Sequence, residues 1–352
     1  MAEEETPRDF AALMFDVLSY QAIAAAVRLG VLERLADGPA AAGELAVAAG
    51  AHEERMARLL RALVALRVLE DGEGRFTLTG AGRLLTRRAE GSEGATHGLA
   101  LFYGDPLTTR VFGELESAVR GDVSAFRHVT GRAFFDYLDS DPEYADRYHR
   151  AMRAGAQMLA PFLAQAYPWG QVRRIVDVGG GDGTSLAALL AAHPGVRGTV
   201  FDTARAVEAA PVRLREAGVD GRCAVEAGSF LEKVPAGADA YLLKNVLHEW
   251  DDTAAVRILG NCRAAMADGG RVLIAATLLA DPSDPEAPEQ TGQDASGALY
   301  AAVSDIQLLC LSGQERTLAH YRRLAAEAGL RVTAVHPLPF IGFYHVIEAA
   351  TV

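Results

Sequence analysis

Cysteine is scarce in this chain, which has only three among its 352 residues. Cys223, Cys262 and Cys310 are odd in number and far apart, and no two of them form a C-x-x-C pair or another metal-binding spacing. We therefore expect reduced cysteines in a hydrophobic core, a cytoplasmic location and no metal site. The acidic first residues lack the features of a signal peptide, and no apolar run approaches the roughly 18 residues that span a membrane.

Positive charge is also in short supply. The 34 Lys and Arg residues are outnumbered by 46 Asp and Glu residues, which gives a formal net charge of -12. Because a protein that binds phosphates needs a clustered positive field, this balance argues against a nucleic-acid or anionic-membrane partner. Half of the residues are hydrophobic, and the length suggests about two domains, so the chain can bury a large core.

The glycine-rich stretch 179–183 lacks the pattern of a dinucleotide loop. It follows an apolar strand at 175–178 and precedes a helical run at 184–192, as nucleotide-binding loops do in α/β sheets. The third glycine of G-x-G-x-x-G is missing in both possible registers, where Thr184 or Leu186 stands. Four glycines in five positions cost backbone entropy unless a close approach requires them, which favours a ligand over a bare turn.

The same stretch lacks the Gly-Lys-Ser/Thr ending of a phosphate loop. Its only charged residues are Asp177 and Asp182, which would repel a pyrophosphate but suit a cationic ligand. S-adenosylmethionine fits, because it carries an ammonium, a sulfonium and a ribose diol. Asp202 ends the next strand, 23 residues after Gly179, close to the spacing at which an acidic residue reaches the ribose hydroxyls. A helix N-cap at Asp202 is the structural alternative, and it is compatible with that role.

The N-terminal segment is predicted to form a winged helix-turn-helix. Helices are expected over residues 10–29, 31–36, 42–49 and 53–66, and two strands over 67–70 and 75–78. One interpretation is a DNA-binding regulator that reads DNA with the helix 53–66. Glu53 and Glu54 lie in the turn that would approach the bases, so we favour packing, with the helix 10–29 offering an apolar face to a second copy of the chain.

The middle of the chain is predicted to be a helical connection. Residues 83–105 are polar and glycine-rich and are expected to form a linker. Helices are then expected over 107–120, 132–140 and 142–167, the last opening after Asp141 as its N-cap. Aromatic and methionine side chains of the last helix serve either the core or one wall of a flat substrate pocket, and the sequence leaves both uses open.

From residue 174 onward, strands and helices alternate, which predicts an α/β fold with a Rossmann-like, mostly parallel sheet. Strands are expected over residues 175–178, 198–201, 223–226, 240–243 and 271–275. A Pro-rich loop at 281–296 comes next, then helices over 298–310 and 318–328 and strands over 332–336 and 343–348. The predicted domains are 1–100 (winged helix, dimerisation), 101–170 (helical linker and substrate pocket) and 171–352 (catalytic).

His248 follows the fourth strand of this sheet. Because ligands of open α/β sheets bind beyond the carboxyl ends of the strands, His248 is expected at the same edge as the glycine-rich stretch. An ordinary histidine pKa of about 6.5 leaves the imidazole mostly neutral at physiological pH, able to accept a proton from a phenolic hydroxyl. The neighbouring acids and Trp250 favour this catalytic role over a structural one.

Three motifs together resemble those of the S-adenosylmethionine-dependent O-methyltransferases of natural-product pathways. They are Val176–Gly183, Leu243–Asp252 and Ser312–Thr317. The resemblance covers nearly the whole chain, and is strongest to actinobacterial polyketide and antibiotic tailoring enzymes and weaker to plant caffeate and flavonoid O-methyltransferases. It implies a class I methyltransferase fold, an N-terminal module that forms a homodimer and does not bind DNA, and methylation of a hydroxyl on an aromatic small molecule.

The resemblance also implies roles for individual residues. His248 would be the general base, Glu315 would orient its imidazole, and Glu249 completes the catalytic set. The expected cofactor-binding residues are Asp177, Gly179, Gly181, Asp202, Ser229, Phe230, Lys244, Asn245 and Arg153. The residues expected to line the substrate pocket are Met152, Phe162, Trp250, Asp305 and Gln307.

Two residues depart from the family pattern. Ser229 stands where the family has an Asp beside the adenine, and Ala276 stands where plant members have a second Glu that supports the histidine. A base held by one carboxylate is expected to contribute less, so that proximity and orientation carry more of the rate. The alternative function is a hydroxylase, decarboxylase or pericyclase on the same scaffold, against which the retained His248 and Glu315 argue.

Overall fold

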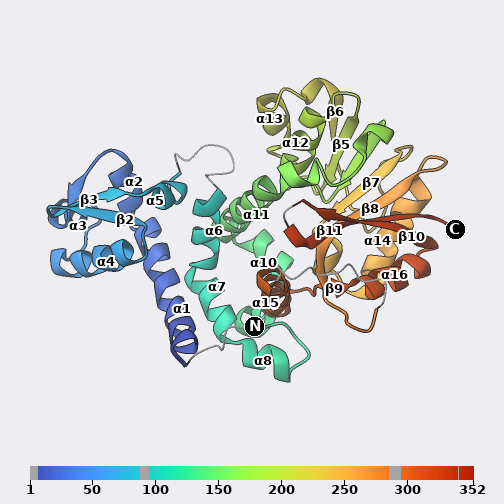
Figure 1. Cartoon of the computed structure of the whole chain (residues 1–352). Coiled ribbons are helices and arrows are strands. Elements are labelled where there is room, and N and C mark those ends of the chain that lie inside the picture. The colour runs from blue at the N-terminus through green and yellow to red at the C-terminus, as the bar shows by residue number, and fades with distance from the viewer. Residues whose placement is uncertain (1–6, 88–94, 285–294, 340) are drawn as a thin grey trace. The chain divides into compact units, whose positions relative to one another are not determined.

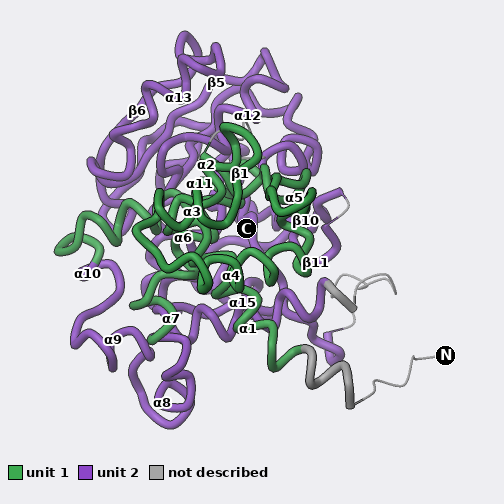
Figure 2. Tube along the Cα trace, turned by 90° about the vertical axis from the view of Figure 1, so that its left-hand side faces the viewer, with its two compact units in different colours: residues 1–110, 138–158 green, residues 111–137, 159–352 purple. Residues whose placement is uncertain are grey.

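The computed structural model describes residues 7–87, 95–284, 295–339 and 341–352 of the chain. The chain divides into two compact units, which Figure 2 shows in different colours. The first comprises Met1–Arg110 and Leu138–Met158, and the second comprises Val111–Tyr137 and Leu159–Val352. The domain boundaries expected from the sequence stay predictions.

The first unit contains the predicted N-terminal helices and hairpin. The helices are α1 (Pro7–Arg28), α2 (Val31–Ala36), α3 (Ala42–Ala48) and α4 (Glu53–Ala65). Strands β2 (Leu69–Gly72) and β3 (Arg75–Leu78) form the hairpin, and β1 (Ala40–Ala41) adds a third antiparallel strand that was not predicted. Leu32, Leu60 and Leu63 are among the buried side chains that hold these elements together.

The linker predicted over 83–105 is wrong for the part that the structure describes. Helices α5 (Gly80–Leu84) and α6 (Ala95–Tyr103) lie there, whereas residues 88–94 are outside the described chain. Phe102 is fully buried, and its ring centroid lies 5.7 Å from that of Tyr144 and 5.5 Å from that of Tyr148. The segment is helical because its apolar side chains pack into the first unit.

The helices between the hairpin and the sheet are more divided than predicted. They are α7 (Pro106–Gly113), α8 (Leu115–Arg120), α9 (Ala125–Thr130), α10 (Phe134–Ser140) and α11 (Pro142–Leu163). The Asp141 carboxylate accepts the Tyr144 amide at 3.0 Å, so α11 begins with the predicted N-cap. The helix ends at Leu163, four residues before the predicted end at Tyr167. At this end the Trp169 indole donates to the Leu163 carbonyl at 3.0 Å.

The second unit is built on a mostly parallel sheet of strand order β10-β11-β8-β7-β4-β5-β6 (Figure 1). β4 to β8 pair in parallel, and the two C-terminal strands are antiparallel. The short strand β9 (Arg316–Thr317) pairs in parallel with β8. The strands are β4 (Arg174–Val178), β5 (Arg197–Asp202), β6 (Cys223–Ala227), β7 (Ala240–Lys244), β8 (Arg271–Leu279), β10 (Leu330–Leu338) and β11 (Ile341–Thr351). The predicted Rossmann-like class is confirmed.

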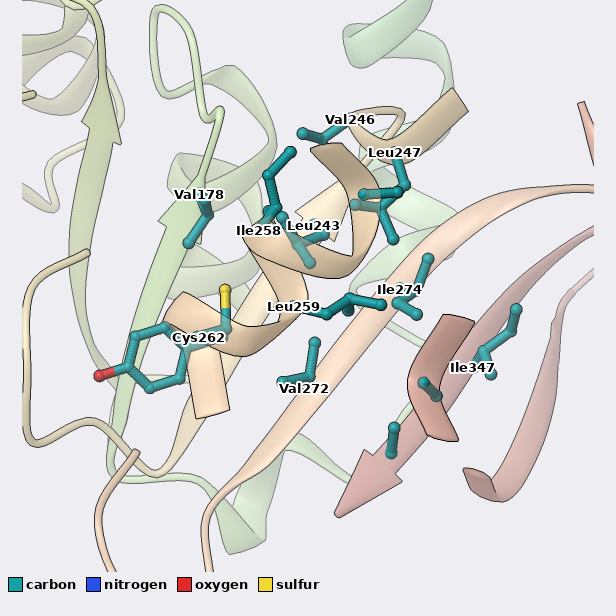
Figure 3. Packing of buried hydrophobic residues seen from close by; sticks show 14 of the residues in the cluster. Val178, Leu243, Val246, Leu247, Ile258, Leu259, Cys262, Val272, Ile274 and Ile347 are labelled. Carbon is teal, nitrogen blue, oxygen red and sulfur yellow. The ribbon is translucent and has the colours of Figure 1, made fainter. Parts of the chain in front are cut away.

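The central strands are buried on both faces, as parallel strands between helices are. Tyr241 and Leu243 of β7 belong to a cluster with α14 (Asp252–Ala265) and α16 (Leu318–Glu327). Leu242 belongs to a cluster with α12 (Thr184–Ala192) and α13 (Ala210–Glu216). Figure 3 shows the first cluster, in which Ile258 and Leu259 of α14 pack among strand residues. The helices of this unit are α12 (Thr184–Ala192), α13 (Ala210–Glu216), α14 (Asp252–Ala265), α15 (Ala295–Leu311) and α16 (Leu318–Glu327).

All three cysteines are free thiols, as the sequence predicts. Cys262 and Cys310 are buried, and Cys223 is half-buried beside the cluster of α12 and α13. Among the helices of the described ranges, none is both long enough and apolar enough to cross a membrane.

Candidate active site

The glycine-rich stretch forms the loop between β4 and α12, as predicted. Gly179 has a φ of 73°, and a Cβ atom placed on it would lie 2.6 Å from the Val246 Cγ2 atom. Both the left-handed backbone and this close approach to the end of β7 require glycine. The Gly179 amide donates to the Phe201 carbonyl at 2.8 Å, which fixes the loop to β5.

Asp202 lies at the end of β5 and holds the same loop. Its carboxylate accepts the amides of Gly181 at 3.0 Å and Thr203 at 2.7 Å. It does not cap a helix, because α13 begins only at Ala210. Asp202 therefore lies beside the glycine loop, as ribose binding would require. The ribose-binding role itself stays a prediction.

Asp177 is buried beneath the loop with an unpartnered oxygen. It is 1% exposed, and its Oδ2 atom has no hydrogen-bond partner among the residues that the structure describes. Burial raises the pKa of Asp177 to about 7, with a further increase from Asp202 and a decrease from Lys244. Burial likewise lowers the pKa of Lys244, the last residue of β7. A cation bound near Asp177 would favour its ionised form.

Asp182, the second acid of the loop, is occupied within the protein. Its Oδ1 atom accepts the Thr184 amide at 3.2 Å and the Thr184 hydroxyl at 2.7 Å, at the start of α12. Its other oxygen lies 3.6 Å from the Arg213 guanidinium. Of these two acids, Asp177 is therefore the one whose charge would favour a cationic ligand.

Ser229 and Phe230 follow β6 at the same edge of the sheet. The preceding Gly228 amide donates to the Asp202 carbonyl at 2.9 Å, which places the segment next to the end of β5. The Phe230 carbonyl accepts the Asn261 side-chain amide at 2.8 Å. Both residues thus lie at the edge of the sheet where the cofactor is predicted to bind. Asp202 lies between them and the glycine loop.

Asn245, directly after β7, has a left-handed backbone with a φ of 55°. Its amide nitrogen donates to the Ala275 carbonyl at 2.9 Å, and its side-chain oxygen accepts the Tyr344 hydroxyl at 2.6 Å. These contacts hold a conformation that is uncommon for a residue other than glycine. Tyr344, which the sequence did not single out, therefore supports the turn that leads to His248.

His248 and Glu315 are brought together from positions far apart in the chain. His248 lies in a short 3-10 turn, Leu247–Glu249, and its Nδ1 atom is 3.3 Å from both carboxylate oxygens of Glu315. The side chains are 12% and 1% exposed, respectively. The Ser304 hydroxyl donates to Glu315 Oε1 at 2.8 Å, and Asp305 accepts the Glu315 amide at 2.8 Å. Ser304 and His248 thus hold the Glu315 carboxylate, and Asp305 holds the Glu315 backbone.

The pair changes the acidity of the imidazole. Burial has the largest effect and lowers the pKa of His248, but the hydrogen bond and charge of Glu315 and the charge of Glu249 raise it, so that it lies above its usual value. The imidazole is therefore a stronger base than an ordinary histidine, and a larger fraction of it is protonated at neutral pH than the sequence alone predicts.

Trp250 lies in a small group of aromatic rings within the second unit. Its ring is parallel to that of Phe135 at 6.2 Å between centroids and nearly perpendicular to that of Phe230 at 5.7 Å. The indole Nε1 atom is buried without a hydrogen-bond partner in the described part of the chain. This arrangement joins a predicted substrate residue to a predicted cofactor residue, and adds Phe135, which the sequence did not suggest.

The remaining predicted site residues are dispersed. Phe162 packs against the core cluster of α12 and α13, and Gln307 is half-buried on α15. Met152, 36% exposed, and the half-buried Arg153 belong to the first unit. Their assignments stay predictions.

A hollow of about 500 Å³ lies at the other end of the parallel strands. It is lined by the first residues of β4, β5 and β6, among them Arg174, Arg197 and Cys223, and by none of the predicted site residues. It is therefore separate from the candidate active site. Within the described ranges, no three His, Cys, Asp or Glu residues are grouped as metal ligands.

Two family models match the sequence. An O-methyltransferase domain matches residues 112–331, and an O-methyltransferase dimerisation domain matches residues 11–88. The chain is 36% identical over 327 residues to the 2,7-dihydroxy-5-methyl-1-naphthoate 7-O-methyltransferase of Streptomyces carzinostaticus, covering 93% of both proteins. The solved mitomycin 7-O-methyltransferase superimposes with a TM-score of 0.85 at 31% identity, covering 98% of this chain and 97% of the other.

Another similar structure contains ligands. It is an O-methyltransferase from neocarzinostatin biosynthesis in complex with S-adenosylmethionine and 2-hydroxy-5-methyl naphthoic acid. Its TM-score is 0.75 at 34% identity, covering 95% of this chain and 96% of the other. A relative of different activity, the aclacinomycin 10-hydroxylase of Streptomyces purpurascens, is 31% identical over 96% of this chain and 90% of its own.

Proposed function

Because the chain belongs to the O-methyltransferase family, we propose that it methylates a phenolic hydroxyl of an aromatic natural-product intermediate, with S-adenosylmethionine as the methyl donor. The observation that carries this proposal is the buried His248–Glu315 pair, which follows β7 next to the glycine loop after β4. Relatives named for naphthoate and mitomycin substrates support an aromatic acceptor.

The residues of the loop fit this donor. The buried, unpartnered Oδ2 atom of Asp177 suits a ligand with positive charge, and a Cβ atom on Gly181 would meet nothing within 4 Å, so the loop leaves room there. Asp177, Gly181 and Asp202 would hold the donor, with Lys244 near its methionine end as the family resemblance implies. When bound, S-adenosylmethionine supplies a methyl group on a sulfonium, which needs no further activation as a leaving group.

His248 performs the proton transfer in this proposal. With Nδ1 hydrogen-bonded to Glu315, the imidazole carries its proton there and leaves Nε2 free to accept another. The acceptor hydroxyl gives its proton to Nε2 as its oxygen bonds to the methyl carbon and the carbon–sulfur bond breaks. Glu315 stabilises the resulting imidazolium, because the pair is shielded from water. Ser304 supports Glu315 in a chain that has Ala276 in place of the second glutamate.

The product of the reaction distinguishes this proposal from its rivals. With a donor labelled in its methyl group and a panel of hydroxylated aromatic acids and quinones, we expect a labelled methyl ether and an equal amount of S-adenosylhomocysteine, measured by mass spectrometry. A product that gains oxygen without formation of S-adenosylhomocysteine would show hydroxylation, the activity for which one relative is named. A label found only on nitrogen would show N-methylation. Either result would contradict O-methylation.

We also propose that the protein is a homodimer. The matched dimerisation domain supports this state, as does α1, on which Leu13, Phe15 and Leu18 are each more than half exposed. We expect a solution mass of twice 37.3 kDa by light scattering, and a shift toward the monomer when Leu18 is replaced by Glu. A wild-type protein that is monomeric at micromolar concentration would contradict the proposal. The cytoplasmic location stays a prediction.

A further inference from the structure

Arg316 follows Glu315 in the chain, and its side chain is fully buried. A buried guanidinium destabilises a protein unless its donors are paired. Three acceptors of its hydrogen bonds come from one segment, the turn that carries His248 and the residues just after it. Asp252 alone would neutralise the charge, so the two bonds to carbonyl oxygens have another effect, which is to hold this segment of backbone.

The guanidinium bridges the two ends of that turn. It donates to the Leu247 carbonyl at 2.6 Å and to the Trp250 carbonyl at 2.7 Å, while the Asp252 carboxylate accepts its Nη2 atom at 3.0 Å. Leu247 is itself anchored in the core cluster of Figure 3. The residues between these two carbonyls are His248 and Glu249, so Arg316 fixes the backbone on both sides of the imidazole.

The residues just before Arg316 contact the same turn. The Gln314 amide donates to the His248 carbonyl at 2.8 Å, and a Cβ atom on Gly313 would lie 2.1 Å from that carbonyl oxygen. Four successive residues therefore contact the turn: Gly313 through its backbone, Gln314 through its amide, Glu315 through its carboxylate and Arg316 through its guanidinium. A slip of either segment would separate Nδ1 of His248 from the Glu315 carboxylate.

We infer that Arg316 is a positioning residue, which locks the His248 turn in register with Glu315 so that the imidazole and the carboxylate stay paired. The inference rests on the proposed function, in which His248 is the base. The charged groups that act on the imidazole are Glu315, Glu249 and Lys244. Of these, Glu315 alone is hydrogen-bonded to it, so loosening the register weakens the raising effect of Glu315 most.

The test compares Arg316→Lys with Arg271→Lys. Lysine keeps the charge but lacks the planar fork that reaches two carbonyls and a carboxylate at once. Arg271 is a matched control, because it bridges the Tyr167 hydroxyl and the Glu348 carboxylate at the amino end of β8, away from His248. We expect Arg316→Lys to lower the His248 pKa measured by NMR, to shift the acid limb of the rate profile to lower pH, and to lower kcat about tenfold or more. Arg271→Lys should change only the melting temperature.

The outcomes separate this inference from the proposed function. A folded Arg316→Lys protein with an unchanged His248 pKa would overturn the positioning role. A lowered pKa with an unmoved rate profile would support the positioning role and remove His248 as the base. If Arg316→Lys does not fold, Gly313→Ala decides instead, because it displaces the same turn without changing any charge. We expect it to lower the His248 pKa as well, and an unchanged value there would equally overturn the inference.

Discussion

Replacing His248 by Ala lowers kcat by about 10²- to 10⁴-fold, the usual contribution of a general base, while the affinity for S-adenosylmethionine changes little. The reason is that the buried imidazole is paired through Nδ1 with a carboxylate, so that it can accept a proton through Nε2. The measurement is steady-state kinetics with an accepted aromatic substrate, together with cofactor titration by calorimetry. Glu315 remains in place, but it has no imidazolium left to stabilise.

A second histidine controls for nonspecific effects of the substitution. His128 is exposed on α9, and His128→Ala should leave kcat and the melting temperature unchanged. Full turnover by His248→Ala would contradict the base assignment and would leave orientation as the source of the rate. A loss of cofactor affinity equal to the loss of kcat would show instead that the turn supports binding and not proton transfer.

Asp177→Asn is expected to weaken S-adenosylmethionine binding by about 10- to 100-fold, the scale on which a buried charge partner acts, and at the same time to stabilise the ligand-free protein at pH 8. The pKa of Asp177 is raised to about 7, so its ionised form is disfavoured in the fold. The stability that its protonation contributes is fully present below the unfolded value near 3.8 and is lost as the pH rises through about 7. Asparagine cannot ionise, so the gain in the free energy of unfolding is about 1–3 kcal/mol at pH 8 and fades toward pH 4.

Asp182→Asn is the matched control for this trade between stability and binding. Asp182 belongs to the same loop, but its carboxylate is satisfied by Thr184 and lies near Arg213. We expect no gain in stability at pH 8 and a smaller loss of affinity, measured by urea denaturation and calorimetry. Equal effects of the two substitutions would contradict the assignment of Asp177 as the acid that faces the donor.

The strands and the first helix of the sheet could be predicted from the sequence because their signals are local. Strands buried on both faces are continuous apolar runs, and the helix after the glycine loop was predicted as Thr184–Ala192, the bounds that it has in the structure. The prediction of a linker over residues 83–105 was wrong for a physical reason. Its glycines look like linker residues, yet Gly98 lies where α6 and α11 approach so closely that a Cβ atom would be 2.8 Å from the Arg150 carbonyl.

The candidate site was predicted in part, through motifs, and the rest depends on contacts across the fold. His248 and Glu315 could be named from the resemblance, and the structure brings them to 3.3 Å. Tyr344 and Ser304 carry no local pattern, because their roles arise from hydrogen bonds to distant residues. From the sequence, a charged residue such as Arg316 is expected at the surface, whereas it is buried in the structure. The raised pKa of His248 depends on burial and on neighbouring charges, which the sequence does not show.

The pH dependence of kcat/KM in the wild type and in Glu315→Gln tests the central claim most directly, because it reports the acidity of the base in the free enzyme. The claim is that His248 acts as the base and that Glu315 raises its pKa. We predict that the wild-type rate rises with pH through a midpoint above 6.5, and that Glu315→Gln moves this midpoint to lower pH with a lower plateau, since burial then dominates. Profiles of the two proteins with the same midpoint would contradict the account.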